Sequence, residues 1–315
     1  MPGTALWRGG GHPARASLGV TVTPTWQRIR AVYGRRRRAL RQAMLEPLLV
    51  GWPVLRQVVT SALSARGHLV LCELGDVRFF VDPGDRVVGA WLMWHGGWQR
   101  REIDAAVEVL LAAGRLQPGA AFIDIGAHIG THTIYALRTG RFERAVAFEP
   151  EPRNARLLAM NLDANGVSER VVVVRKAAGA AAGTATLHLH PRNTGAHAID
   201  VPPSVDGEAS VVVPVVRVED ELQALGVLPE TVALIWVDVE GYEPQVLAGL
   251  AGLIARSVPL AFEFTPSRYS PDVKQRLARL LARHYTTVHS LGRRDATAPV
   301  GTLASRMHTD DVLVY

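Results

Sequence analysis

The sequence predicts an α/β protein with a mostly parallel, seven-stranded sheet, an antiparallel pair of strands at its C-terminal edge, and a basic N-terminal extension. Three observations support this fold class. From about residue 121 onward, short runs rich in Val, Ile and Ala alternate with helical patterns, as is typical of parallel sheets with helices on both faces. A corner containing an acid and two glycines joins the first of these strands to a helix. The last two apolar runs are joined by a loop without a helical pattern, which indicates antiparallel strands.

The segments before this corner are predicted as a hairpin and a helix. Residues 68–82 contain two short β-like runs joined by a Gly-Asp turn, and residues 83–114 pass through a turn into an amphipathic helix that ends near Gly114. The first buried strand follows in "AAFIDIG", ending near Ile125, and a helix begins at about Thr131.

The alternation then continues to the end of the chain. Strands are predicted over 144–150, 170–178, 233–241, 259–267, 285–291 and 310–315, and helices over 151–166, 218–226, 242–256 and 272–284. Strands near 184–190 and 211–216 read as a hairpin with a polar loop between them. No internal repeat is present.

Charge is concentrated at the N-terminus. The chain of 315 residues carries a formal charge of +6, whereas residues 1–60 contain ten Arg and a single acid, Glu46, and so carry +9. The remainder therefore sums to −3. We interpret residues 1–66 as a basic extension, partly disordered and then helical, and residues 67–315 as the folded domain. The extension either contacts an anionic membrane surface or a protein partner, or is a solvated basic helix face.

Cysteine content and hydropathy restrict the environment of the protein. Cys72 is the only cysteine, which excludes intrachain disulfides and cysteine-based zinc sites. No run of about 18 apolar residues suggests a transmembrane helix, and the apolar stretch after Arg41 is broken by Pro and charge, unlike a secretory signal. We expect a cytoplasmic location.

The glycine corner, "FIDIGAHIG", indicates the kind of ligand. It lacks the middle glycine of a dinucleotide fingerprint and the Gly-Lys-Ser/Thr of a phosphate loop. Asp124 would repel a pyrophosphate at this corner, whereas Glu149, at the end of the next strand, suits two ribose hydroxyls. S-adenosylmethionine has that chemistry, because it combines ribose hydroxyls with an amino group and a sulfonium.

Four segments in this order, "DIGAHIGTHT", "AFEPEPRNARLLAMNL", "RNTG" and "VDVEGYEPQVLAGL", resemble the FkbM family of S-adenosylmethionine-dependent methyltransferases. The resemblance covers roughly residues 70–315 and implies a Rossmann-like class I methyltransferase fold. It implies that Glu149 holds the ribose, that Pro150 shapes the turn after it, and that Ala177 lies near the adenine. The corner residues implied to hold the methionine part are Asp124, Gly126, Ala127, His128 and Gly130. Two positions depart from the family pattern, which usually has Asn at His128 and Lys at Trp236.

The chemistry of transfer points to a group of acids. Asp238 and Glu240 are two residues apart in a predicted strand, so they would project to one side, and Glu263 ends the next strand. We expect Asp238 and Glu240 to orient or activate an acceptor hydroxyl, supported by Glu263. Alternatively, one acid caps the following helix and another pairs with Arg. His128 is a further candidate base. Mg²⁺ held by the three acids is not favoured, and we assign no metal ligand.

These observations predict an O-methyltransferase acting on a hydroxyl of a small molecule, as in natural product biosynthesis, or of a sugar or glycan. The alternatives are a nucleic-acid methyltransferase that uses the Arg-rich N-terminus, and a cofactor-binding module without turnover. The net negative charge of residues 61–315 disfavours a nucleic acid partner. The acid–glycine–acid series disfavours a module without activity.

Overall fold

A computed structural model describes residues 53–199, 209–292 and 297–315. The basic stretch expected to contact a membrane or a partner therefore lies outside the described residues, except for α2 (Pro53–Ala65). None of the described helices has both the length and the apolar character needed to cross a membrane.

The central sheet has eight strands in the described part of the chain, in the order β13-β12-β14-β11-β10-β3-β4-β5. Their bounds are β3 Ala121–Ile125, β4 Arg144–Phe148, β5 Val171–Val174, β10 Val232–Val237, β11 Leu260–Phe264, β12 Thr287–Ser290, β13 Thr297–Pro299 and β14 Asp310–Val314. The five strands from β5 to β11 are parallel. The predicted mostly parallel α/β sheet is confirmed.

The C-terminal part of the sheet differs in detail from the prediction. β12 and β14 pair antiparallel as expected, but β14 lies between β11 and β12 and is antiparallel to both. The expected count of seven strands is wrong, because the short β13 adds an eighth at the edge through its pairing with β12. Its three residues include Pro299, which is tolerated at an edge but gives no strand signal in a sequence.

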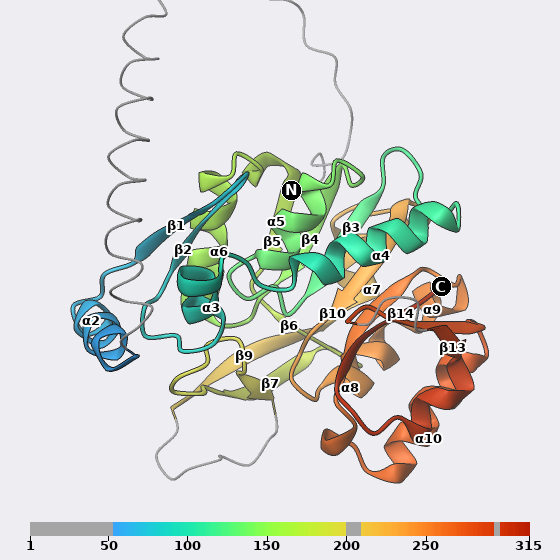
Figure 1. The fold of residues 1–315 in the computed structure, drawn as a ribbon. Coiled ribbons are helices and arrows are strands. Elements are labelled where there is room, and N and C mark those ends of the chain that lie inside the picture. The colour runs from blue at the N-terminus through green and yellow to red at the C-terminus, as the bar shows by residue number, and fades with distance from the viewer. Residues whose placement is uncertain (1–52, 200–208, 293–296) are drawn as a thin grey trace, which may run out of the picture.

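Helices cover both faces of this sheet (Figure 1). One face, which includes Phe122 and Trp236, packs against α4 (Arg100–Ala112), α5 (Thr131–Arg138) and α6 (Pro152–Ala164). The opposite face carries Ile123 and Ile235. Its covering helices are α7 (Val218–Ala224), α8 (Glu243–Gly249), α9 (Ala251–Ala255) and α10 (Pro271–Ala282). The helix predicted over 242–256 is divided into α8 and α9, which meet at Leu250.

Two smaller sheets flank the central one. β1 (Val70–Leu74) and β2 (Val77–Val81) form the predicted hairpin, followed by α3 (Val88–His95). The other sheet has the order β6-β9-β7-β8, with bounds Ala177–Gly179, Ser210–Arg217, Gly183–His188 and Ala198–Ile199. The single strand predicted over 170–178 is thus two strands, β5 and β6, in different sheets.

Two buried amides fix the hairpin on the domain. Asn161 of α6 and Asn165, the C-cap residue of this helix, each accept a hydrogen bond from a backbone N–H of β2 and donate one to a backbone carbonyl of the same strand. They satisfy backbone groups that the edge of a two-stranded sheet would leave unpaired. The chain after β2, which contains Asp82 and Asp85, is thereby placed beside the carboxyl ends of β3 and β4.

Candidate functional site

The glycine corner is built by backbone conformation and close packing. Gly126 and Gly130 have φ values of 88° and 92°, a region that only glycine adopts easily. A Cβ on Gly126 would overlap the backbone carbonyl of Asp238, and one on Gly130 would lie 2.6 Å from Leu158 Cδ1. We expected these glycines to admit a ligand. In the structure their missing side chains make room for the backbone of Asp238, just after β10, and for Leu158 of α6.

A cavity opens beside this corner. Its lining includes five of the residues predicted to bind cofactor, Gly126, His128, Glu149, Pro150 and Ala177, together with Asp238. The sequence prediction also named Asp124, Ala127 and Gly130, which do not line the cavity. A loop between β7 and β8 supplies Thr194, Gly195 and His197 to the lining, and Thr194 lies in contact with His128 of the corner.

Glu149 is placed at the end of β4 by two backbone hydrogen bonds. Its Oε2 accepts from the N–H of His128 at 2.8 Å, and its Oε1 accepts from the N–H of Glu151 at 2.8 Å. Burial raises the pKa of this carboxyl to about 8. In the ionised form each oxygen retains a second lone pair, so the oriented carboxylate can still accept hydrogen bonds from a ligand.

Asp124 lies on the face of β3 that packs against α4, α5 and α6, and it is fully buried. Its Oδ2 accepts a hydrogen bond from the Thr133 hydroxyl, whereas its Oδ1 has no partner among the described residues. Burial raises the pKa of Asp124 to about 7. Asp124 does not line the cavity, and its contact with the methionine part of a cofactor stays a prediction.

The three acids expected to act together lie in two different settings. β10 ends at Val237, so the two-residue period of a strand does not extend to Asp238 and Glu240. Glu240 has a φ of 56°, and its carboxylate pairs with Arg268. Arg268 also bonds Glu263 at 3.0 Å. The alternative reading, an acid paired with Arg, thus applies to these two residues.

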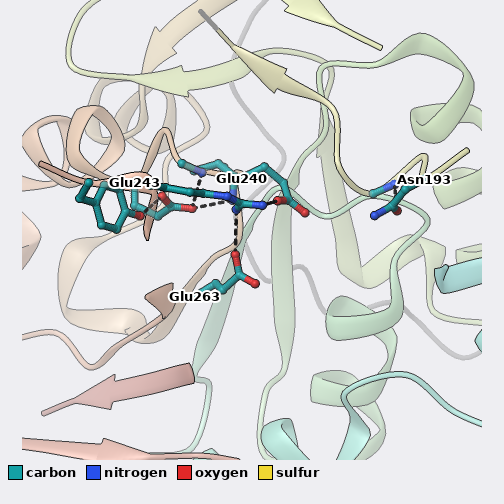
Figure 2. A network of polar contacts seen from close by, with 9 residues as sticks. Asn193, Glu240, Glu243 and Glu263 are labelled. Atoms are coloured by element: carbon teal, nitrogen blue, oxygen red, sulfur yellow. Dashed lines mark hydrogen bonds and ion pairs between the residues drawn. The ribbon is translucent and has the colours of Figure 1, made fainter. Parts of the chain in front are cut away.

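Figure 2 shows Glu240, Glu243 and Glu263 close together, with Asn193 of the loop between β7 and β8 apart from them. Glu243, fully buried at the start of α8, accepts from the backbone N–H of Gly241 at 3.1 Å and from the Tyr269 hydroxyl. Glu243 thus organises the turn after Asp238, and no side chain among the described residues caps α8, the role expected of one of the three acids. Within residues 53–199, 209–292 and 297–315, no group of three His, Cys, Asp or Glu side chains is arranged to hold a metal ion.

Asp238 differs from its neighbours. It lines the cavity, and its carboxylate has no hydrogen bond or ion pair to any residue that the structure describes. Burial raises its pKa well above the ordinary value, and the nearby charges of Glu240, Glu263 and Asp311 raise it further. A partly buried carboxyl with a raised pKa and a free face is suited to accept a proton.

Several polar residues around the site were not predicted. Thr194 and Asp85 bond each other beside His128. The only sequence signals were the "RNTG" loop and a turn, "DPGD". On the face covered by α4, α5 and α6, the Gln99 side chain hydrogen-bonds both His132, at 2.9 Å, and Asp311, at 3.0 Å. The His132 ring lies 4.7 Å from that of Trp236, which is fully buried and fills the place where the family usually has Lys. These contacts join distant segments, so no local pattern reveals them.

Comparison with known proteins defines the class. A family model described as the methyltransferase FkbM domain matches residues 124–287, more than half of the chain. The protein is thus a methyltransferase with S-adenosylmethionine as its methyl donor. The chain belongs to the FkbM methyltransferase family. No curated protein matches it closely enough to count as a relative.

Solved structures with a similar arrangement are distant. The tRNA (uracil-54, C5)-methyltransferase of Pyrococcus abyssi, in complex with S-adenosyl-L-homocysteine, is 15% identical, with a TM-score of 0.36. The match covers 78% of this chain and 43% of that one. A SAM-dependent methyltransferase from Agrobacterium tumefaciens is 11% identical over 78% of this chain and 69% of that chain, with a TM-score of 0.41. The family assignment depends on the family match and not on these likenesses.

Proposed function

We propose that this methyltransferase transfers a methyl group to a hydroxyl of a small molecule, such as a secondary metabolite, or of a sugar or glycan. The observation that carries the proposal is the free carboxyl of Asp238 in the same cavity as Glu149. An alcohol is a weak nucleophile, and a base that removes its proton accelerates its methylation.

The residues of the cavity fit S-adenosylmethionine. The two oriented oxygens of Glu149 suit the ribose hydroxyls. Pro150, Ala177, Ala178, Leu187 and Ile199 give the cavity an apolar part that suits the adenine ring. When bound, S-adenosylmethionine supplies an electrophilic methyl group on its sulfonium.

Asp238 would take the hydroxyl proton on its carboxylate as the acceptor oxygen bonds the methyl carbon and the bond from that carbon to sulfur breaks, which would release S-adenosylhomocysteine. Its raised pKa makes it a stronger base than an exposed Asp. Glu240 and Glu263 support it through their charges, which Arg268 partly balances. Burial lowers the pKa of His128 to about 4, so His128 is a weaker candidate for the base and fits the cofactor-binding role better.

The acids also bear on the class of acceptor. Asp238, Glu240, Glu263 and Asp311 act on one another electrostatically, and Arg268 is the cation paired with two of them in the described residues. Such a field repels phosphates, so a neutral or amino-bearing hydroxyl compound suits it better than a nucleic acid. The basic N-terminal extension remains a proposed contact for an anionic membrane or a protein surface.

The proposal is tested with Asp238→Asn and a matched exposed control, Asp272→Asn on α10. We expect the first to lower turnover about 100-fold or more, the usual scale of general-base catalysis, with an unchanged Kd for S-adenosylhomocysteine. The control should retain full turnover. The substrate panel contains hydroxylated metabolites, oligosaccharides, RNA and DNA, and mass spectrometry reports each gain of one CH₂.

Different results would contradict different parts of the proposal. Full activity of Asp238→Asn removes this residue from the mechanism, and methylation confined to RNA or DNA refutes the acceptor class. Because Arg268 lies between Glu240 and Glu263, EDTA should leave turnover unchanged. A loss of turnover that Mg²⁺ restores would contradict that expectation.

A further inference from the structure

Three polar side chains form a line that ends at the cavity. Asp85 lies in the turn before α3, Thr194 in the loop between β7 and β8, and His128 in the glycine corner. Thr194 Oγ1 lies 3.0 Å from Asp85 Oδ2 and 2.8 Å from His128 Nε2. Segments more than 40 residues apart in the chain thus meet at one hydroxyl.

The direction of these hydrogen bonds follows from the atoms available. Asp85 is 2% exposed, and its carboxylate already accepts from the backbone N–H groups of Val87 at 2.9 Å and Gly89 at 3.0 Å. A carboxylate has no proton to donate, so the Thr194 hydroxyl donates to it. That hydroxyl has a single hydrogen, so toward His128 it can only accept, and Nε2 must carry the ring proton.

The opposite ring nitrogen is then left as an acceptor. His128 is 9% exposed, and its low pKa keeps the ring neutral at neutral pH, with a single N–H. Its Nδ1 therefore has a lone pair and no hydrogen-bond partner among the described residues, and it is not one of their fully enclosed polar atoms. It lies 3.6 Å from the place that a Cβ on Gly195 would take, at the wall of the cavity.

We propose that Asp85 and Thr194 are positioning residues that hold His128 in its Nε2–H tautomer, so that Nδ1 accepts a hydrogen bond from an N–H or O–H donor of S-adenosylmethionine. This inference rests on the proposed placement of the cofactor in the cavity. The other neutral tautomer would present an N–H to the same donor and repel it, which is why the tautomer matters for binding.

The loop keeps its place without the Thr194 hydroxyl, which makes a clean substitution feasible. Asn154 Nδ2 donates to the backbone carbonyl of Thr194 at 2.9 Å, and the N–H of Arg86 donates to the carbonyl of Arg192 at 2.8 Å. Thr194→Val keeps the branched shape and removes only the hydroxyl, whereas Thr194→Ser keeps the hydroxyl. Thr186→Val, at an exposed position in β7, is the matched control.

The first measurement is the ¹⁵N chemical shift of the His128 ring in the full-length protein, assigned by its loss in His128→Asn. We expect the wild type and Thr194→Ser to show the Nε2–H tautomer, and Thr194→Val to show a mixture. The second measurement is calorimetry with S-adenosylhomocysteine and with 5′-methylthioadenosine, which lacks the amino-acid part. We expect Thr194→Val to bind S-adenosylhomocysteine about 3- to 30-fold more weakly, the range for one hydrogen bond. Thr194→Ser and the control should bind like the wild type.

The two ligands locate the donor. Weaker binding of S-adenosylhomocysteine alone assigns the donor to the α-amino group. Weaker binding of both ligands assigns it to the adenosine part, that is, to a ribose hydroxyl or the adenine amino group. Either result supports the inference. An Nδ1–H tautomer in the wild type, or unchanged affinity of Thr194→Val for both ligands, overturns it. If the wild type releases no heat with S-adenosylhomocysteine, the cofactor placement itself is refuted. The tautomer of the wild type is measured without any substitution in the loop.

Discussion

Gly126→Ala is expected to destabilise the protein far more than the same substitution at another glycine with a similar backbone. Gly126 has a φ of 88°, and an added Cβ would overlap the carbonyl oxygen of Asp238. Gly140 has a φ of 70°, is exposed, and has no atom within 4 Å of an added Cβ. Gly140→Ala therefore measures backbone strain alone, and the difference between the two variants measures the overlap.

The magnitudes follow from these surroundings. A non-glycine residue in the left-handed region costs about 1–2 kcal/mol, which is the expected loss for Gly140→Ala. Overpacking adds about 1–3 kcal/mol. At Gly126 the upper part of that range applies, because the Asp238 N–H donates to Ile125 O at 2.9 Å and fixes the obstructing backbone. We expect a total loss of about 3–5 kcal/mol for Gly126→Ala.

Urea unfolding of both variants beside the wild type gives the free energies of unfolding. Calorimetry with S-adenosylhomocysteine shows whether the corner keeps its shape, and we expect binding to be lost only in Gly126→Ala. Equal destabilisation by the two substitutions would refute the reasoning, because it would show that the end of β10 does not press on the corner.

Two further predictions concern buried acids. Burial raises the pKa of Glu149 from its ordinary value of 4.5 to about 8, so the folded chain keeps this proton after the unfolded chain has lost it, and the free energy of unfolding should fall as pH rises between these values. Glu149→Gln should flatten this decline by up to about 1.4 kcal/mol per pH unit in urea titrations, and an unchanged slope would contradict the assignment. Tyr269→Phe leaves buried Glu243 without one donor and should lower the free energy of unfolding by about 1–3 kcal/mol. It should also lower turnover by loosening the turn after Asp238. Tyr285→Phe, which removes a bond to the carbonyl of Val258, should leave turnover unchanged, and similar turnover in the two variants would exclude the link to Asp238.

Much of the fold could be predicted because its signals are local. The runs that became β3, β4, β10 and β11 are mostly apolar, as expected of strands buried on both faces. The predictions that went wrong concern contacts with little local signal. β13 is a strand only because β12 lies beside it, and the segment predicted over 170–178 divides because β6 pairs with β9.

The candidate site shows the same division. The positions of Glu149 and Asp238 could be predicted, since they follow β4 and β10, which lie on either side of β3, and parallel strands end at one edge of a sheet. The sequence could not predict that Glu240 is paired while Asp238 is free. That difference depends on the ion pair of Glu240 with Arg268, which follows β11, and on the left-handed backbone at Glu240.

The sequence by itself determined the alternating strands and helices, the glycine corner, and the acids at the strand ends. These features depend on the backbone preferences of neighbouring residues and on the spacing of apolar residues along the chain. Only the tertiary structure decided which acid is free and which is paired, what the glycines make room for, and that Asp85, Thr194 and His128 share one chain of hydrogen bonds. Those outcomes depend on distances between segments far apart in the chain, which folding sets when the two faces of the sheet are buried.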